Sequence, residues 1–138
     1  MAKTLARQLA EAFGDVEAMR ALYADNIIWS LQASLGRIAG PYEGKEAVMA
    51  FNERVWGSFY YPECTVDILN ELGDDAHSAV RFTYNAKLRS SEGPYSLEYI
   101  LFVRAEGGQI TRVDESMDTM GSVNLFAGEE IAKNPYRG

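Results

Sequence analysis

The stretch Tyr95–Asp118 reads YSLEYILFVR, AEGG and QITRVDESMD, and it decides how the rest of the chain is interpreted. Two apolar runs flank a turn that contains two glycines, a pattern that predicts a β-hairpin. Glu98 lies in the middle of the first run, between Leu97 and Tyr99. An ionised carboxylate in such a place is costly to bury unless it is paired, protonated or facing a polar cavity. The hairpin therefore predicts a sheet and marks Glu98 as a candidate acid.

The second arm of the hairpin carries two further candidates, Glu115 and Asp118. A connection of two or four residues pairs positions of opposite parity, which would place Glu98 and Glu115 on one face of the sheet. Side chains that are directly opposite or one step diagonal are roughly 5–8 Å apart. A three-residue loop or a bulge would separate the two carboxylates. In the alternative interpretation, Glu115 is solvated and Glu98 is bound to a backbone or tyrosine donor.

Length and composition bound the class of protein. The 138 residues fit one domain, 1–138, with a weakly structured tail from about residue 121. The net charge is −7 and no basic run occurs, which argues against a nucleic-acid or anionic-membrane partner. With one cysteine, Cys64, an intrachain disulfide is excluded, and we expect no metal or cofactor. No apolar run approaches the ~20 residues of a membrane span and the N-terminus does not resemble a signal peptide, so a cytoplasmic location is expected.

The segments before the hairpin predict three helices and three strands. Apolar residues at helical spacing indicate helices at 3–13, 15–23 and 45–59, and β-branched or aromatic content indicates strands at 26–32, 65–72 and 78–88. In the last of these strands Val80, Phe82 and Tyr84 share the buried face, and the tyrosine hydroxyl should find a partner. The segment 33–44 is rich in glycine and is expected to be a loop at a functional rim.

This order of elements predicts an α+β fold. A curved antiparallel sheet, shaped like a cone, would wrap around three N-terminal helices and leave a pocket at its open end. Such pockets are mostly apolar with a few polar groups, which is the usual form of a small-molecule site.

Three stretches of the chain resemble a known family. GDVEAMRALYADNIIW (14–29), GPYEGKEAV (40–48) and RAEGGQITRVDESMD (104–118) are similar to the nuclear transport factor 2-like superfamily, most closely to its branch of SnoaL-like polyketide cyclases and ketosteroid isomerases. The resemblance covers about residues 5–120. It implies the cone-shaped fold and a homodimer, while the activities of the family range from isomerases, cyclases, dehydratases and epoxide hydrolases to non-catalytic binders.

The resemblance also assigns roles to particular residues. It aligns the protonated oxyanion-hole acid of the isomerases with Glu98, and it places the acid/base aspartate of the polyketide cyclases at Glu115 or Asp118. The basic aspartate of the isomerases would fall at about Leu31, which is not a carboxylate. Their oxyanion tyrosine would fall near Gln8 or Leu9, so it is absent as well. We cannot place the Asp-Arg-Asp arrangement of the epoxide hydrolases in this chain.

Taken together, these patterns predict a site with carboxylates as its catalytic groups, Glu98, Glu115 and Asp118. The expected substrate-binding residues are Trp29, Leu31, Phe51, Val55, Trp56, Val80, Phe82, Tyr84 and Met117. One hypothesis is a cofactor-independent isomerase, cyclase or dehydratase that uses one carboxyl group as an acid and another as a base. The alternative is a binding protein of the same fold without chemistry, in which Glu98 anchors a ligand. A third class is a structural dimerisation domain.

The expected partners follow from the same residues. The run 95–104 is apolar on both faces, so the face that does not line the pocket should be covered in a homodimer. We expect Glu98 to face the pocket. A pocket with acids and no lysine or arginine should bind a neutral, hydrophobic, cyclic molecule and reject anionic ligands.

Overall fold

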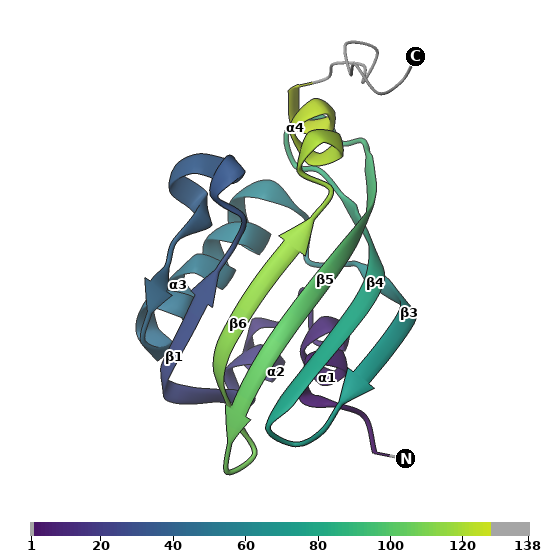
Figure 1. Ribbon diagram of the computed structural model, residues 1–138. Helices are drawn as coiled ribbons and strands as arrows, with labels where there is room; N and C mark the ends of the chain where they lie inside the picture. The colour runs from purple at the N-terminus through teal and green to yellow at the C-terminus, as the bar shows by residue number, and fades with distance from the viewer. Residues whose placement is uncertain (1, 128–138) are drawn as a thin grey trace.

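Six strands form one curved sheet in the order β2-β1-β6-β5-β4-β3 (Figure 1). The structure is a computed structural model and describes residues 2–127. The strands are β1 (Tyr23–Ser30), β2 (Tyr42–Glu43), β3 (Thr65–Gly73), β4 (His77–Lys87), β5 (Pro94–Glu106) and β6 (Gln109–Met117). All neighbours pair antiparallel except β1 and β6, which run parallel. The expected α+β fold with a curved sheet is confirmed, and the parallel pair is the one departure from a purely antiparallel sheet.

The predicted helices are present; the first two are shorter than expected, and the third covers the predicted range 45–59 with its last five residues in a π-helical turn. They are α1 (Leu5–Glu11), α2 (Val16–Arg20) and α3 (Lys45–Arg54), and α3 continues as a π-helical turn, η2 (Val55–Phe59). The first two helices have side-chain N-caps, because Thr4 accepts from the Arg7 amide and Asp15 accepts from the Ala18 amide. Figure 1 shows α1, α2 and α3 on one side of the sheet. The segment expected as a loop at 33–44 contains a 3₁₀ segment, η1 (Ala33–Ala39), followed by β2.

A glycine fixes the turn between the first two helices. Gly14 has a φ of 89°, which favours glycine, and a Cβ at this position would clash with the carbonyl oxygen of Pro62. This close approach holds the end of α1 against the segment before β3. Phe13, directly before the glycine, is thereby held in the core.

The hairpin of β5 and β6 contains a bulge that sets the register. Glu106 pairs with Gln109 around a two-glycine turn, and Ala105 pairs with Ile110. The next pair is Arg104 with Arg112, so one extra residue, Thr111, lies on β6. Beyond the bulge every residue of β6 shifts by one position relative to β5, which reverses the faces that a simple two-residue hairpin would give.

The concave face of the sheet and the helices enclose one aromatic core. Its largest fully buried side chains include Trp29, Tyr23, Tyr84, Tyr95 and Phe82. Phe13 extends from the end of α1 into this group and packs edge-on against Phe82 at 5.5 Å between ring centroids. Edge-to-face contacts of this kind add specificity to the burial of apolar area.

The prediction of a weakly structured tail from about residue 121 is wrong for the part that the structure describes. Residues Thr119–Ala127 form a helix, α4, beside the end of the sheet (Figure 1). Asp118 begins it, because its carboxylate accepts from the Gly121 amide at 2.8 Å and its carbonyl accepts from the Ser122 amide at 2.9 Å. The rest of the predicted tail, residues 128–138, lies outside the described residues.

Candidate functional site

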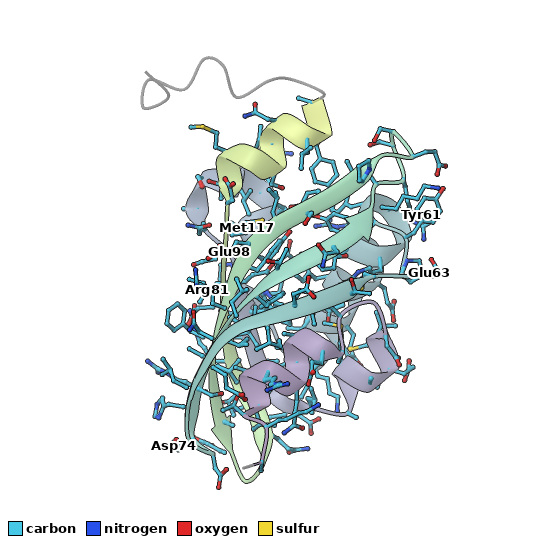
Figure 2. All side chains as sticks on the ribbon, turned by 90° about the vertical axis from the view of Figure 1, so that its right-hand side faces the viewer. Tyr61, Glu63, Asp74, Arg81, Glu98 and Met117 are labelled. Carbon is cyan, nitrogen blue, oxygen red and sulfur yellow. The ribbon has the colours of Figure 1, made fainter. Side chains whose placement is uncertain are left out.

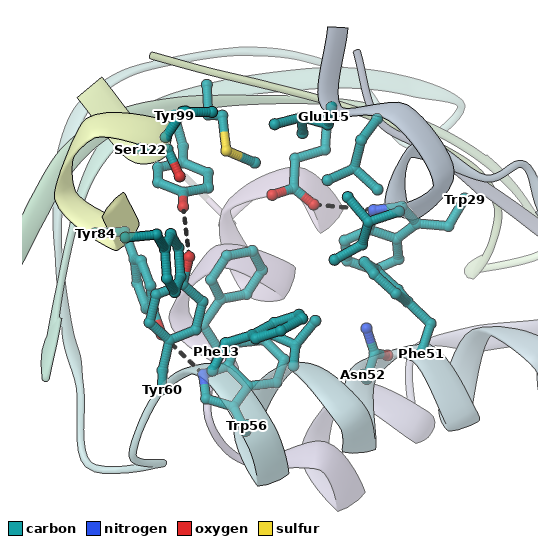
Figure 3. A pocket seen from close by; sticks show the side chains of 18 of the residues that line it. Phe13, Trp29, Phe51, Asn52, Trp56, Tyr60, Tyr84, Tyr99, Glu115 and Ser122 are labelled. Atoms are coloured by element: carbon teal, nitrogen blue, oxygen red, sulfur yellow. Dashed lines mark hydrogen bonds between the residues drawn. The ribbon is translucent and has the colours of Figure 1, made fainter. Parts of the chain in front are cut away.

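A cavity of about 470 Å³ lies between the concave face of the sheet, α3, η1 and α4 (Figure 3). Its wall includes most of the predicted substrate-binding residues, namely Trp29, Leu31, Phe51, Val55, Trp56, Tyr84 and Met117. The wall is almost entirely aromatic and aliphatic. Among the described residues, no lysine or arginine lines the cavity.

Glu115 is the carboxyl group of this cavity. It lies on β6 opposite Leu101, with only 8% of its surface exposed. Its Oε1 accepts a hydrogen bond of 2.9 Å from Nε1 of Trp29, which is on the neighbouring strand β1. Burial opposes ionisation and raises the pKa of Glu115 to about 7, while the indole hydrogen bond opposes this rise. Near neutral pH this carboxyl group can therefore both accept and donate a proton.

Glu98 does not face the cavity, and this expectation is corrected. Its side chain lies on the outer face of the sheet, 49% exposed, and pairs with Nη1 of Arg81 at 2.7 Å (Figure 2). The bulge at Thr111 explains the difference, because it places Glu115 opposite Leu101 and therefore on the face that Glu98 does not share. The scheme of two carboxylates in one pocket, with Glu98 as a neutral acid or ligand anchor, is not supported.

Asp118 is also absent from the cavity wall. It is exposed, and its carboxylate caps α4. Glu115 is thus the only carboxylate among the described residues that line the cavity.

Val80 and Phe82, predicted to bind substrate, lie in the core behind the cavity. Phe82 is completely buried, between Phe13 on one side and Tyr99 on the other. Phe13 lines the cavity and Phe82 does not, so the end of α1 separates this part of the sheet from the cavity. Alternation along β4 identified the inner face correctly, but it could not show which inward residues a helix covers.

Tyrosine hydroxyls add to the polarity of the wall, through the lining residues Tyr84 and Tyr99 and through Tyr95, which does not line the cavity but bonds to Tyr99 and Ser122. Tyr84 accepts from Nε1 of Trp56 at 2.8 Å, which confirms the expected partner for its hydroxyl. The hydroxyls of Tyr95 and Tyr99 are 2.7 Å apart, and Tyr95 donates to Oγ of Ser122 on α4 at 2.9 Å. Burial raises the pKa of each of these tyrosines, so they remain protonated at neutral pH.

Several lining residues were missed by the sequence analysis. Asn52 lies four residues after Val48, on the apolar stripe of α3, and a polar residue at such a position is a usable signal. Tyr99 has the same parity as Leu101, so the register of the hairpin would have identified it. Ser122 and Phe126 come from α4, which the glycines around it concealed.

The described residues contain no cluster of acidic, histidine or cysteine side chains that could hold a metal ion. Cys64 is half-buried with its Sγ at 3.2 Å from the carbonyl oxygen of Phe13, and burial raises its pKa. None of the helices in residues 2–127 is long and apolar enough to cross a membrane.

Comparison with known proteins places this arrangement in a family. Residues 6–113 match the SnoaL-like domain family. No curated protein matches the chain in sequence. Among solved structures, a candidate SnoaL-like polyketide cyclase from Jannaschia sp. CCS1 is similar with a TM-score of 0.75 and 14% identity, covering 91% of each chain.

Two further solved structures have the same fold. A candidate isomerase from Rhodopseudomonas palustris has a TM-score of 0.73 and 21% identity, over 89% of this chain and 93% of its own. A protein from Catenulispora acidiphila with a ketosteroid isomerase-like fold, solved with trimethylamine, has a TM-score of 0.74 and 17% identity, over 95% of this chain and 97% of its own. At these identities the likeness shows the fold alone.

Proposed function

The chain belongs to the SnoaL-like domain family, and from this premise we propose that it is a cofactor-independent isomerase or cyclase that acts on a neutral, hydrophobic, cyclic substrate. The observation that carries the proposal is Glu115, a single buried carboxyl group held by Trp29 in an apolar cavity. A carboxyl group with a pKa of about 7 is matched to general acid–base work at neutral pH.

One carboxyl group is sufficient for the proposed chemistry. Ionised Glu115 removes a proton from a carbon next to a carbonyl group of the substrate. The electrons of the C–H bond form a C=C bond, and the π electrons of the carbonyl move to its oxygen to give an enolate. In an isomerase, neutral Glu115 then returns the proton to another carbon of the conjugated system, and the product is an isomer. In a cyclase, the enolate carbon attacks a second carbonyl carbon of the same substrate. A ring closes, and the oxygen of the attacked carbonyl takes the proton from Glu115. Both reactions balance without a co-reactant.

The wall of the cavity supports a neutral and flat substrate. Aromatic rings such as Trp29, Phe51 and Trp56 offer faces and edges on which a planar ring can pack. No cation lines the cavity in the described part of the chain, so an anionic group beside ionised Glu115 would meet repulsion as well as desolvation. The volume of about 470 Å³ is in the range of small-molecule sites.

A second candidate function is binding without chemistry. It is favoured by one observation, which is that Leu31 lines the cavity at about the position where the isomerases carry their basic aspartate. In that case Glu115 would serve as a hydrogen-bonding group for a ligand.

Proton exchange separates the two functions. We expect the protein to accelerate the exchange of deuterium from D₂O into the C1 position of 2-tetralone, an enolisable aromatic ketone, as followed by NMR. Glu115→Gln should lower the catalysed rate by about 10²–10⁴-fold, the range for loss of a general base. Glu98→Gln is the matched control and should exchange like the wild type.

Two results would contradict the proposed enzyme. Equal rates for wild type and Glu115→Gln would remove the role of this carboxyl group. If the protein bound 2-tetralone and other neutral cyclic ketones but did not accelerate their deuterium exchange over buffer, the result would favour a binding protein without chemistry.

A further inference from the structure

Asn52 is a polar group that α3 presents to the cavity. Its side chain is 1% exposed, and it lies among apolar neighbours such as Phe51 and Val55 on the cavity wall. A buried amide in this setting is costly unless its donors and acceptors are paired. The partners of each end of the amide therefore show what the residue does.

The oxygen end of the amide is paired. The hydroxyl of Tyr23 on β1 donates to Oδ1 of Asn52 at 2.6 Å. The reverse orientation would turn the NH₂ group toward Tyr23, and the buried hydroxyl proton of Tyr23 would then have no acceptor among the described residues. Pairing of the tyrosine proton thus fixes the amide in one orientation.

The nitrogen end of the amide has no partner within residues 2–127. This nitrogen keeps some accessible surface. The only side-chain nitrogen or oxygen in these residues that is both fully buried and unpaired is Nε of Arg7. Figure 3 shows the amide nitrogen of Asn52 on the cavity side. The NH₂ group is a donor of fixed orientation that points into an apolar cavity, where an oxygen of a ligand could accept its hydrogen bond.

Contacts through two side chains of β1 link Asn52 to Glu115. Trp29, which donates to Glu115, packs edge-on against Tyr23 at 6.2 Å between ring centroids. The charge of Glu115 is close enough to contribute to the raised pKa of Tyr23, after burial. The proton-accepting group and the fixed NH₂ donor thus line the same cavity and are each held by a side chain of β1, Trp29 and Tyr23.

We infer that Asn52 is the specificity-determining residue that binds the carbonyl oxygen of the substrate, with Tyr23 as its positioning residue. This inference rests on the proposed function, because it names the oxygen acceptor that accompanies proton transfer at Glu115. When the carbonyl becomes an enolate, its oxygen gains negative charge and the hydrogen bond from Asn52 strengthens. A donor that is already oriented stabilises this charge without reorganisation.

The test compares a ketone with its oxygen-free analogue, 2-tetralone with tetralin, by titration calorimetry. Asn52→Leu alone would leave the Tyr23 hydroxyl unpaired and could unfold the chain, so the donor is removed in the double variant Asn52→Leu/Tyr23→Phe, which replaces both partners by apolar groups. Tyr23→Phe alone, which keeps the amide, is the matched control.

We expect the double variant to bind 2-tetralone roughly 2- to 12-fold more weakly than the wild type, the range for one neutral hydrogen bond, and to bind tetralin equally well. Its exchange rate on 2-tetralone should fall by about 10²–10³-fold, as for the loss of one oxyanion donor. Tyr23→Phe should lose less of the preference for the ketone than the double variant, because the amide is still present although its orientation is no longer fixed.

The outcomes distinguish this inference from the proposed function. If the double variant keeps both the ketone preference and the exchange rate, Asn52 does not bind the carbonyl, whatever Glu115→Gln shows. If Tyr23→Phe alone loses as much preference as the double variant, the effect belongs to Tyr23 and the assignment to Asn52 is wrong. If no variant or wild type catalyses exchange but the double variant loses the preference for the ketone, the proposed enzyme fails and Asn52 stands as the ligand-binding donor.

Discussion

Glu98 and Glu115 lie on neighbouring strands of the same hairpin, yet they belong to two different environments. Glu98 is on the outer face, half exposed and paired with Arg81 at 2.7 Å. Glu115 is on the inner face, buried opposite Leu101 and bonded to Trp29. Burial raises the pKa of Glu115 to about 7. The same residue type is a solvated ion-pair partner on one face and a proton-transfer candidate on the other.

The difference shows that the environment of a charged residue in a strand depends on the face it occupies more than on its neighbours in the sequence. Glu98 is surrounded in the sequence by Leu97 and Tyr99, while Glu115 follows Asp114 and precedes Ser116. Sequence neighbours point to opposite faces of a strand, so an apolar run around a charge says little about the environment of that charge.

The largest difference should come from one substitution made on each face. Phe82→Ala removes a completely buried ring, and we expect it to lower the free energy of unfolding by about 3–5 kcal/mol. Phe102→Ala removes a ring that is 52% exposed, and we expect a loss of no more than about 1 kcal/mol for a single chain. Urea unfolding at low protein concentration measures both. Equal losses would show that the outer face is as well packed as the core.

The second prediction concerns pH. The folded protein keeps Glu115 protonated up to a pKa of about 7, whereas the unfolded chain ionises it near 4.5. Its contribution to stability is therefore complete below pH 4.5 and is lost as the pH rises through 7. Relative to wild type, Glu115→Gln should be about 3 kcal/mol more stable at pH 8 and nearly equal at pH 4.

Urea midpoints of wild type and variant from pH 4 to pH 8 provide the measurement, with Glu98→Gln as the control on the outer face. The control breaks an exposed ion pair and should change stability by less than about 1 kcal/mol. A Glu115→Gln variant that is less stable than wild type at pH 8 would show that the buried carboxylate is charged and needed as an anchor.

The third prediction tests the indole that holds Glu115. The Nε1 donor of Trp29 stabilises the ionised form of Glu115. Trp29→Phe removes this donor, so the pKa of Glu115 should rise further. A hydrogen bond to a charged group of about 1.5–3 kcal/mol corresponds to a rise of roughly one to two pH units. Carbon-detected NMR of the Glu115 carboxyl group measures it. A pKa that stays at about 7 would mean that the indole contact does not control the titration.

The smallest effect on the stability of the folded chain is expected when a charged residue is introduced on the outer face of the sheet. We propose a homodimer through this face, because Ile100 and Phe102 present apolar surface beside Glu98. Phe102→Asp should change the stability of the single chain by about 1 kcal/mol or less. Light scattering should give twice 15.3 kDa for wild type and 15.3 kDa for the variant. A monomeric wild type at micromolar concentration would contradict the dimer.

The sequence was sufficient for the fold class and for most of the long elements, although not for the parallel pairing of β1 with β6. The periods of the apolar residues located the three N-terminal helices and the long strands, and the alternation in β4 assigned Phe82 and Tyr84 to the inner face. These features come from patterns repeated over many residues, so one misplaced boundary does not change them.

The site depended on single residues, and there the sequence was insufficient. The type of residue 111, threonine, does not reveal a bulge, yet this bulge places Glu115 opposite Leu101 and thus on the inner face, which Glu98 does not share. Gly121 interrupts the apolar pattern of α4, so the sequence analysis did not predict this helix or the cavity-lining residues that it contributes. Asn52 was overlooked on an apolar stripe although a polar residue at that position needs a partner.

The parallel pairing of β1 with β6 has a consequence for synthesis on the ribosome. Trp29 and Glu115 are 86 positions apart, so the indole is made long before its partner. At about 5–20 residues per second, the nascent chain carries an unprotected first strand for roughly 4–17 s. During that interval the edge of β1 that β6 will cover is open to other chains or chaperones. Stalled chains that end at the glycine turn, residue 108, should therefore be cut by protease within β1, and chains that include β6 should resist.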